Sequence, residues 1–518
     1  MAVRVLTDVK LPIEKDESEL LKIAEKALKR KPAYFAIRKK SLDARDKSNL
    51  RYVYTIEFDG VAQPVHRETL DKLPVRKLPR LPVVVVGSGP AGLFCALRLL
   101  DRGIPPIVVE RGPCVEERAK KTDVFFRERK LDPDGNVQFG EGGAGTFSDG
   151  KLNTQTHGGY NRTVLETFVR YGAPNEILWW NKPHLGSDHL QRIVKNMRDD
   201  ILARGGQVWF DSKLTDILLQ NGRLTGVTVK RKTGESLSMD AVCIVLAIGH
   251  SARDTFEMLY EKGVEMEQKE FSVGVRIEHL QTDISRAQYG AEYTKLPPAD
   301  YKLVSHTSAR AAFTFCMCPG GIVIPAASEE SGVVVNGMSN YARDEKNANA
   351  ALIAQVRKED FRSEHPLAGI EYQRVLERAA FAAGGRDYRA PVQLVGDFLR
   401  GRTSDRFGEI LPSYAAGTAF ADLGEVLPPV IATALREGLT DMDRKLKGFA
   451  RPDAILTGVE SRTSSPVRIR RGEDMQSVSV KGLYPCGEGA GYAGGITSAA
   501  ADGLKTADAI YGQYMQES

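Results

Sequence analysis

The chain has 518 residues, and at about 150 residues per domain a chain of this length holds roughly two to four domains. Charged residues make up 27% and hydrophobic residues 42%, values typical of a globular protein, which excludes wholesale disorder. The net charge is +5, and no apolar run approaches the roughly 18 residues of a membrane span. The N-terminus lacks the apolar region of a signal peptide, so the sequence predicts a cytoplasmic protein without a membrane partner.

The cysteine and glycine contents give further information about the compartment and the ligand. Six cysteines are too few for a disulfide framework, and none has the spacing of a zinc-binding pair, so we expect a reducing compartment and no metal site. Glycine is in excess, with 49 residues in the chain. Fifteen of them lie within residues 135–159 and 482–503, which indicates two places where backbone approaches a ligand closely.

Residues 1–79 carry the whole basic excess of the chain, with 18 Lys and Arg against 12 Asp and Glu. Their hydrophobic pattern predicts a small α+β module of the ferredoxin-like type, followed by a proline-rich linker. Its expected elements are a strand over 3–9, a helix over 17–29, and strands over 34–38 and 51–58. The basic run 38–47 is expected to be either a solvated connection or a docking site for an acidic partner.

The most informative segment follows the linker. Residues 82–86 form an apolar strand, and the sequence Gly-Ser-Gly-Pro-Ala-Gly at 87–92 leads directly into a helix. The next apolar strand ends on Glu110. In such a unit the glycines allow a tight turn and close approach to a pyrophosphate, while the acidic residue accepts hydrogen bonds from a ribose. The segment therefore predicts dinucleotide binding, and Glu110 disfavours a ribose that carries a 2′-phosphate.

Two further segments are expected to meet this motif. Residues 140–151 resemble a phosphate loop, but Leu152 stands where a Ser or Thr would bind magnesium. They are either a surface loop or, as we prefer, a loop folded over the cofactor. Residues 241–248 read as a buried strand that ends at Gly249, and the glycines of 482–496 precede a helix whose N-terminus would face the cofactor.

The middle of the chain contains no second motif of this kind, so no separate nicotinamide domain is expected. Strand-like pieces occur at 271–277 and 332–337, and residues 347–358 read as a polar helix. We expect this region to cover the cofactor and shape a substrate site.

The motifs together resemble those of FAD-dependent oxidoreductases of the glutathione-reductase-like superfamily. The similarity is closest to a family of uncharacterised FAD-dependent dehydrogenases, in which GSGPAG, GEGGAGTFSDGKL, FCMCPGG, SRTSSPVRI and CGEGAGYAGGI recur in this order. The resemblance implies an α/β protein: a Rossmann-type FAD-binding domain with an inserted α+β capping domain and the N-terminal module. The implied boundaries are 1–79 for the module, 80–260 and 465–518 for the FAD-binding domain, and 261–464 for the cap.

The same resemblance implies which residues hold FAD, through the pyrophosphate, the ribose, the adenine and the flavin. The predicted cofactor-binding residues are Gly87, Ser88, Gly89, Ala91, Gly92, Glu110, Arg111, Gly145, Thr146, Leu214, Gly249, Gly487, Glu488, Gly495 and Ile496.

Three further sets of residues are candidate catalytic groups, and each has a plain structural alternative. Cys316 and Cys318 precede Pro-Gly-Gly and are either a redox-active pair or small packing residues in a tight turn. Arg462 either clamps an anionic substrate or lies in a solvated strand pair. Lys151, with Asp149, is a candidate proton donor or flavin contact.

These observations predict an FAD-dependent oxidoreductase that transfers a hydride to or from a small molecule, with NADH or NADPH as a candidate transient electron donor. Two alternatives stay open. The basic module could direct a flavoenzyme to RNA or to an acidic protein, although a nucleic-acid partner is disfavoured because the module lacks an aromatic RNA-binding motif. The chain could also bind flavin without turnover. The sequence predicts neither the substrate nor the oligomeric state.

Overall fold

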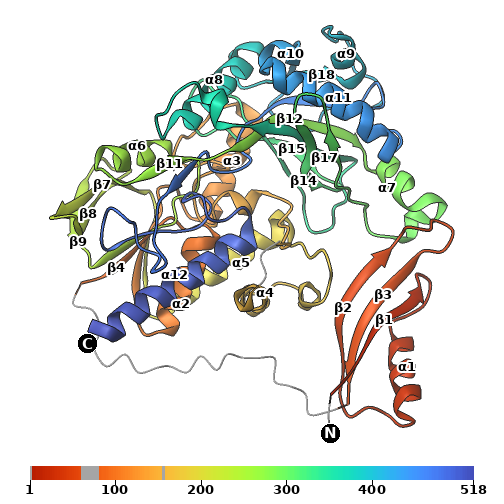
Figure 1. The fold of residues 1–518 in the computed structure, drawn as a ribbon, viewed down its shortest axis with the longest axis horizontal. Coiled ribbons are helices and arrows are strands. Elements are labelled where there is room, and N and C mark those ends of the chain that lie inside the picture. The colour runs from red at the N-terminus through yellow and green to blue at the C-terminus, as the bar shows by residue number, and fades with distance from the viewer. Residues whose placement is uncertain (1–2, 60–80, 155–157, 518) are drawn as a thin grey trace.

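The computed structural model describes residues 3–59, 81–154 and 158–517 (Figure 1). Its chain is a mixed α/β structure with a small N-terminal sheet, a parallel sheet flanked by long helices, and a large mixed sheet. No helix within the described residues has both the length and the apolar character needed to cross a membrane.

The N-terminal module has one helix and an antiparallel sheet of order β1-β3-β2. Its elements are β1 (Arg4–Pro12), α1 (Ser18–Leu28), β2 (Phe35–Asp43) and β3 (Arg51–Phe58). Leu20 and Ala24 on α1 pack against Tyr54 and Ile56 of β3 to make its core. The prediction that residues 38–47 form a connection was wrong for 39–43. These residues continue β2 and pair with β3 after an irregularity at Arg38.

The module is attached to the rest of the chain through Lys40. Its backbone N–H donates to the Trp179 carbonyl at 2.8 Å, and its carbonyl accepts from the N–H of Asn181 at 2.8 Å. The ammonium group lies 4.5 Å from the ring centre of Tyr52 and 5.1 Å from that of Trp180. These cation–π contacts and the ion pair with Glu17 at 2.5 Å hold the lysine within the protein, so its charge is not free for a separate acidic partner.

The parallel sheet has the order β22-β10-β4-β5-β6. Its strands are β4 (Val83–Val86), β5 (Pro106–Val109), β6 (Gln207–Trp209), β10 (Cys243–Leu246) and β22 (Leu483–Pro485). The strands are short and apolar because both faces are buried. One face packs against the helices α2 (Pro90–Asp101), α4 (Gly159–Arg170), α5 (Gly186–Ala203) and α12 (Ile496–Glu517). The predicted strand–turn–helix–strand unit is therefore present as β4, α2 and β5.

A three-stranded antiparallel sheet covers the other face. Its strands are β7 (Ser212–Gln220), β8 (Arg223–Arg231) and β9 (Ser236–Asp240). Helix α6 (Arg253–Glu261) packs beside β7, and α3 (Val115–Glu128) leads from β5 toward the loop of residues 140–151. A short ribbon of β11 (Met266–Gln268) and β21 (Val467–Ile469) connects this part to the large sheet.

The large sheet has seven strands in the order β13-β14-β17-β12-β20-β18-β19. They are β12 (Phe271–Leu280), β13 (Val304–His306), β14 (Ala311–Cys318), β17 (Asn347–Val356), β18 (Ala390–Leu394), β19 (Thr418–Phe420) and β20 (Ile455–Glu460). Beside it lies the hairpin of β15 (Ile322–Pro325) and β16 (Val335–Met338). The helices of this region are α7 (Gln281–Tyr289), α8 (Ala368–Ala383), α9 (Val395–Arg400), α10 (Leu423–Val426) and α11 (Pro429–Lys445). We call this region, residues 271–460, the cap.

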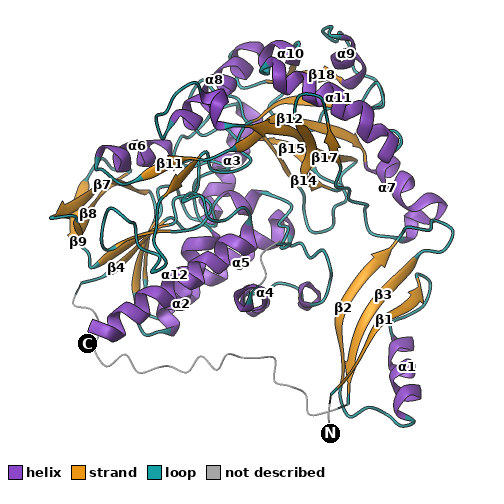
Figure 2. Ribbon diagram, in the orientation of Figure 1, coloured by secondary structure: helices purple, strands orange, loops and turns teal. Residues whose placement is uncertain are grey.

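Figure 2 shows α8, α10 and α11 on the side of the cap sheet that faces away from α2 and α12. The prediction of a helix over 347–358 was wrong, because residues 347–356 form β17 in the interior of this sheet, between β12 and β14. The strand is buried on both faces, so its sequence lacks the alternation that marks a half-buried strand. Its alanines favour a helix only when tertiary pairing does not override them.

Candidate functional site

The first glycine motif is closely packed where β4 turns into α2. A Cβ atom on Gly87, whose φ is +100°, would lie 2.2 Å from the carbonyl oxygen of Ala247, at the end of β10. A Cβ on Gly92 would lie 1.9 Å from the Gly87 carbonyl oxygen. Both positions therefore require glycine, and their packing brings the start of α2 to the carboxyl ends of β4 and β10.

The loop of residues 140–151 lies directly on this motif. The N–H of Gly142 donates to the Ser88 carbonyl at 2.9 Å, and a Cβ on Gly143 would stand 2.9 Å from the Cα of Gly89. On its other side, a Cβ on Gly145 would lie 3.0 Å from the Cγ1 of Ile496, the first residue of α12. We call residues 140–151 the covering loop.

The C-terminal glycine cluster completes the arrangement. A Cβ on Gly487 would be 2.7 Å from the Cβ of Ala91, and one on Gly489 would be 2.4 Å from the Gly249 carbonyl oxygen. The structure thus brings together four segments distant in sequence: the α2 turn, the covering loop, the end of β10 and the turn before α12.

Several observations show that these segments fit a dinucleotide. A Cβ on Gly249, Gly494 or Gly495 would meet nothing within 4 Å, so the chain leaves room there. The buried Thr146 Oγ1 and His250 Nδ1 have no hydrogen-bond partner among the described residues. No described side chain caps the start of α2, so its first backbone N–H groups are available to an anion.

Glu110 ties two of the segments together. One carboxylate oxygen accepts from the N–H and hydroxyl of Ser88 at 2.9 and 2.8 Å, and the other accepts from the N–H groups of Gly112 and Gly140 at 3.0 Å each. A ribose hydroxyl would share this carboxylate with backbone donors, and its contact with Glu110 stays a prediction.

Two other predicted residues lie at the edge of these segments. Arg111 stacks on Phe139, with its guanidinium carbon 4.2 Å from the ring centre, and pairs with Asp254 at 2.7 Å. Leu214 is buried in β7, opposite Val229. Their contacts with the cofactor also stay predictions.

Glu488 and His250 face each other beside the open space. The His250 Nε2 atom is 3.8 Å from the Glu488 carboxylate. Burial raises the pKa of Glu488 to about 7, against the opposing charge of Lys269. Burial and the nearby charges of Arg462 and Arg253 lower the pKa of His250 to about 3, so this imidazole is neutral at physiological pH.

Asp149 and Lys151 of the covering loop form an ionic clamp to the cap. Arg343 donates to both carboxylate oxygens of Asp149, at 2.9 and 2.6 Å, and Ser339 donates at 2.6 Å. Although burial opposes ionisation, the charges of Lys151 and Arg343 hold the pKa of Asp149 well below its usual range. Asp149 is therefore ionised and fully paired, and its role as a proton donor stays a prediction.

Lys151 continues the same clamp. Its ammonium lies 3.0 Å from Asp149 and donates to the Met317 carbonyl on β14. Burial lowers its pKa, but the charge of Asp149 outweighs this and keeps the lysine protonated. The covering loop is thereby joined to the Cys316–Cys318 segment of the cap.

Cys316 and Cys318 are free thiols at an irregular point of β14, where Cys316 has a φ of +40°. The fully buried Arg276 donates to the Cys316 carbonyl at 2.7 Å and to the Cys318 sulfur at 3.4 Å. Burial raises the pKa of Cys316 to about 12 and also raises that of Cys318, against the charges of Lys151 and Arg276. Both thiols are therefore protonated near neutral pH, and a redox role for them stays a prediction.

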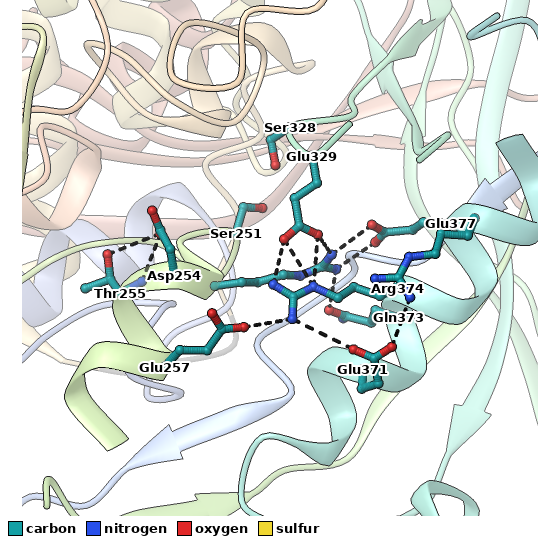
Figure 3. A network of polar contacts seen from close by, with 12 residues as sticks. Ser251, Asp254, Thr255, Glu257, Ser328, Glu329, Glu371, Gln373, Arg374 and Glu377 are labelled. Carbon is teal, nitrogen blue, oxygen red and sulfur yellow. Dashed lines mark hydrogen bonds and ion pairs between the residues drawn. The ribbon is translucent and has the colours of Figure 1, made fainter. Parts of the chain in front are cut away.

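Arg462 lies in a buried network that crosses from the cap to the parallel-sheet part, of which Figure 3 labels Glu377, Ser251 and Ser328. It donates to the two carboxylate oxygens of Glu377 at 3.0 and 2.8 Å. Arg253, at the start of α6, donates to the same two oxygens at 2.7 and 2.9 Å. The side chains of Arg253, Glu377 and Arg462 are only 1%, 2% and 3% exposed.

The remaining donors of Arg462 are also engaged. Its Nη1 donates to the hydroxyls of Ser251 and Ser328, at 3.1 and 2.5 Å. An anionic substrate would have to displace one of these partners. Sequence reasoning singled out Arg462 but missed Glu377 and Arg253, because no local motif marks residues that meet only in the folded chain.

Comparison with known proteins places the chain in a family. A family model described as "FAD-dependent protein, C-terminal domain-like" matches residues 270–463, and a model for a domain of unknown function matches residues 4–59. An uncharacterised protein of Clostridium beijerinckii is 45% identical over 531 residues and covers 98% of both chains. The chain belongs to this family of FAD-dependent proteins.

More distant similarities were also found for this FAD-dependent protein. An NADH:fumarate oxidoreductase of Klebsiella pneumoniae is 24% identical over 196 residues, which cover 32% of this chain and 20% of that protein. A mutated FrdA chain of the E. coli quinol fumarate reductase aligns in structure over 85% of this chain and 71% of its own, at 11% identity and a TM-score of 0.39. A geranylgeranyl bacteriochlorophyll reductase-like protein of Thermoplasma acidophilum aligns over 84% and 81%, at 14% identity and a TM-score of 0.36.

We expect neutralisation of Glu377, the carboxylate shared by Arg253 and Arg462, to destabilise the fold strongly. Glu377→Gln leaves two guanidinium groups buried with one carboxylate partner fewer, so we expect a loss of about 3–5 kcal/mol in the free energy of unfolding, measured by urea denaturation. Glu371→Gln, on the exposed side of the same helix, is the control and should cost less than about 1 kcal/mol. Equal losses in the two variants would refute the interpretation.

The stabilisation that the Glu377 carboxylate contributes depends on pH, and the direction of this dependence follows from the same contacts. Burial opposes ionisation of Glu377, but Arg253 and Arg462 hold its folded-state pKa well below the ordinary value of 4.5. The stability difference between wild type and Glu377→Gln should therefore be complete above pH 4.5 and shrink as the pH falls toward the folded-state pKa.

The protein atoms packed around Cys316 desolvate its thiol and raise its pKa, which predicts low reactivity although the residue's own surface is accessible. Because the thiolate is the nucleophile, iodoacetamide at about pH 8 should modify Cys316 at least about tenfold more slowly in the folded chain than in the unfolded chain. Peptide mass spectrometry gives the rate for this residue. The folded-state rate should also rise steeply above about pH 10. A folded-state rate equal to the unfolded one would mean that Cys316 is a reactive thiol.

Proposed function

We propose that this FAD-dependent protein is an oxidoreductase that acts on a small molecule bound between the covering loop and the cap. The observation that carries the proposal is the convergence of four glycine-containing segments on the starts of α2 and α12, with open space at Gly249, Gly494 and Gly495. FAD, when bound, supplies the capacity to accept or deliver a hydride.

Different segments of the chain would bind different parts of FAD. The unpaired N–H groups at the start of α2 would hold the pyrophosphate, and Ser88 and Glu110 would fix the turn that presents them. The N-terminus of α12, at Ile496, carries partial positive charge and would stabilise negative charge on the flavin ring. Thr497 orients this end, since its hydroxyl donates to the Leu152 carbonyl at 2.8 Å.

The cap supports the small-molecule part of the proposal. Lys151 and Asp149 bind the covering loop to β14 and Arg343 of the cap, so the cap closes over the same loop that lies on the α2 turn. A substrate admitted between them would be shielded from water, as hydride transfer requires. The sequence lacks a second dinucleotide motif, so a nicotinamide donor would bind only transiently.

The N-terminal module does not favour a second function in RNA or acidic-protein binding. Several of its basic groups are already paired with carboxylates within the module: Arg30 with Asp59, Arg38 with Glu57, Lys40 with Glu17 and Arg45 with Asp43. These pairs reduce the charge available to an anionic partner.

Gly89 gives a direct test of the FAD site. A Cβ there would contact only the Gly143 Cα, at 3.7 Å, which the fold tolerates. Because the second glycine of such a motif lets the backbone approach a pyrophosphate closely, Gly89→Ala should weaken FAD binding at least tenfold while the melting temperature of the flavin-free chain stays nearly unchanged. Gly512→Ala, in an open position of α12, is the control. Undiminished FAD binding by Gly89→Ala would contradict the proposed site.

Reduction of the bound flavin tests the proposed activity. Mixing the FAD-loaded chain with NADH or NADPH in the absence of oxygen should bleach the visible flavin band, followed by stopped-flow absorbance. Cys318→Ser tests the predicted redox role of this thiol: a rate unchanged within about twofold is expected of a thiol that burial keeps protonated, and a large loss would indicate a redox-active cysteine. No bleaching with either nucleotide would remove nicotinamide as the donor. A flavin that no small-molecule donor reduces would contradict an oxidoreductase.

A further inference from the structure

A cavity lies between α6 and the start of α8, away from the four cofactor segments. Its volume is about 510 Å³, within the range of roughly 300–1,000 Å³ that small-molecule sites occupy. The lining residues are Glu257, Phe361, Ser363, His365, Leu367, Ala368, Ile370, Glu371, Tyr372, Arg374 and Val375. None of them belongs to the predicted cofactor-binding or catalytic residues.

The walls of this cavity are mainly apolar and are not fully covered by the chain. Phe361 and Tyr372 contribute aromatic rings whose centres are 5.9 Å apart. Val375 is 56% exposed at its edge, and the neighbouring Tyr260, whose ring meets that of His365, is 41% exposed. Exposed apolar side chains beside a cavity gain free energy when an apolar group covers them.

The polar end of the cavity is acidic. Glu257 and Glu371 both line it, whereas Arg374 is the single cationic group that does. Figure 3 shows both carboxylates directed toward Arg374. Arg374 is 2.7 Å from Glu257 and 3.8 Å from Glu371, and it also pairs with Glu329 at 2.8 Å.

Glu371 is the less satisfied of the two carboxylates. Apart from the long contact with Arg374, it pairs at 3.2 Å with Arg378, a side chain that is 60% exposed. Exposed pairs of this kind contribute little and are exchanged readily for another cation. The cavity therefore combines an apolar surface with a carboxylate able to accept an ammonium group.

We propose that this cavity binds a small hydrophobic amine. Its aromatic or aliphatic part would lie against Tyr372 and Val375, and its ammonium group would pair with Glu371. This site is independent of the proposed redox function, because it shares no residue with the cofactor segments.

Isothermal titration calorimetry on the full-length, FAD-loaded chain tests the proposal with three probes of one ring size. They are 2-phenylethylamine, which is cationic at neutral pH, neutral 2-phenylethanol and anionic phenylacetate. We expect the amine to bind at least tenfold more tightly than phenylacetate, with the alcohol between them. Glu371→Gln should weaken binding of the amine several-fold and leave the affinity for the alcohol unchanged.

Two variants locate the binding. Ala368→Phe should fill the cavity and abolish binding of the amine and the alcohol. Val375→Lys changes an exposed edge residue that the fold does not need; it removes an apolar contact and adds a positive charge, so it should weaken binding of the amine more than binding of the alcohol. Glu359→Gln, an exposed carboxylate outside the cavity, is the matched control and should change nothing.

The results that overturn the proposal are equally specific. They are the absence of binding by the amine, equal affinity for the three probes, or amine binding that survives both Ala368→Phe and Val375→Lys. Loss of FAD in the Gly89→Ala variant leaves this site untouched, so failure here is separate from failure of the proposed function.

Discussion

The carboxylate of Glu377 holds the cap against the parallel-sheet part of the molecule. Each of the two guanidinium groups that it binds is almost wholly removed from water, and a buried charge without a partner costs several kcal/mol. Arg253 comes from α6, while Glu377 comes from α8 of the cap. The two parts can therefore bury these groups only in the one relative position that brings a single carboxylate between both arginines.

A second ionic clamp joins the covering loop to the cap. Asp149 on the covering loop accepts from Arg343 and Ser339, and Lys151 reaches the backbone of β14. Charged hydrogen bonds are directional, whereas apolar contacts tolerate sliding. Two such clamps therefore fix the position of the cap relative to the covering loop and the parallel-sheet part, as the proposed hydride transfer over a short distance would demand.

The sequence predicted the parts of the fold that local chemistry dictates. The β4–α2–β5 unit was found because glycine spacing and short apolar strands are local signals. Residues 347–356 were misread because burial on both faces of β17 removes the alternation that distinguishes a strand. Glu377 was missed for a different reason: its partner Arg253 is 124 residues away in the chain, and no pattern in one sequence pairs two charges at that distance.

The titratable groups around the cofactor segments differ in what they can do with a proton. Asp149 is held ionised by its cationic partners, Cys316 is held protonated by burial, and the pKa of about 3 keeps His250 neutral. Glu488 alone of these four has a pKa, about 7, at which it exchanges a proton near physiological pH. It lies in the turn before α12, 3.8 Å from His250. Glu488 is therefore placed to exchange a proton near neutrality beside the end of α12 that faces the flavin in the proposed complex, and burial also raises the pKa of Glu141 in the covering loop to about 7.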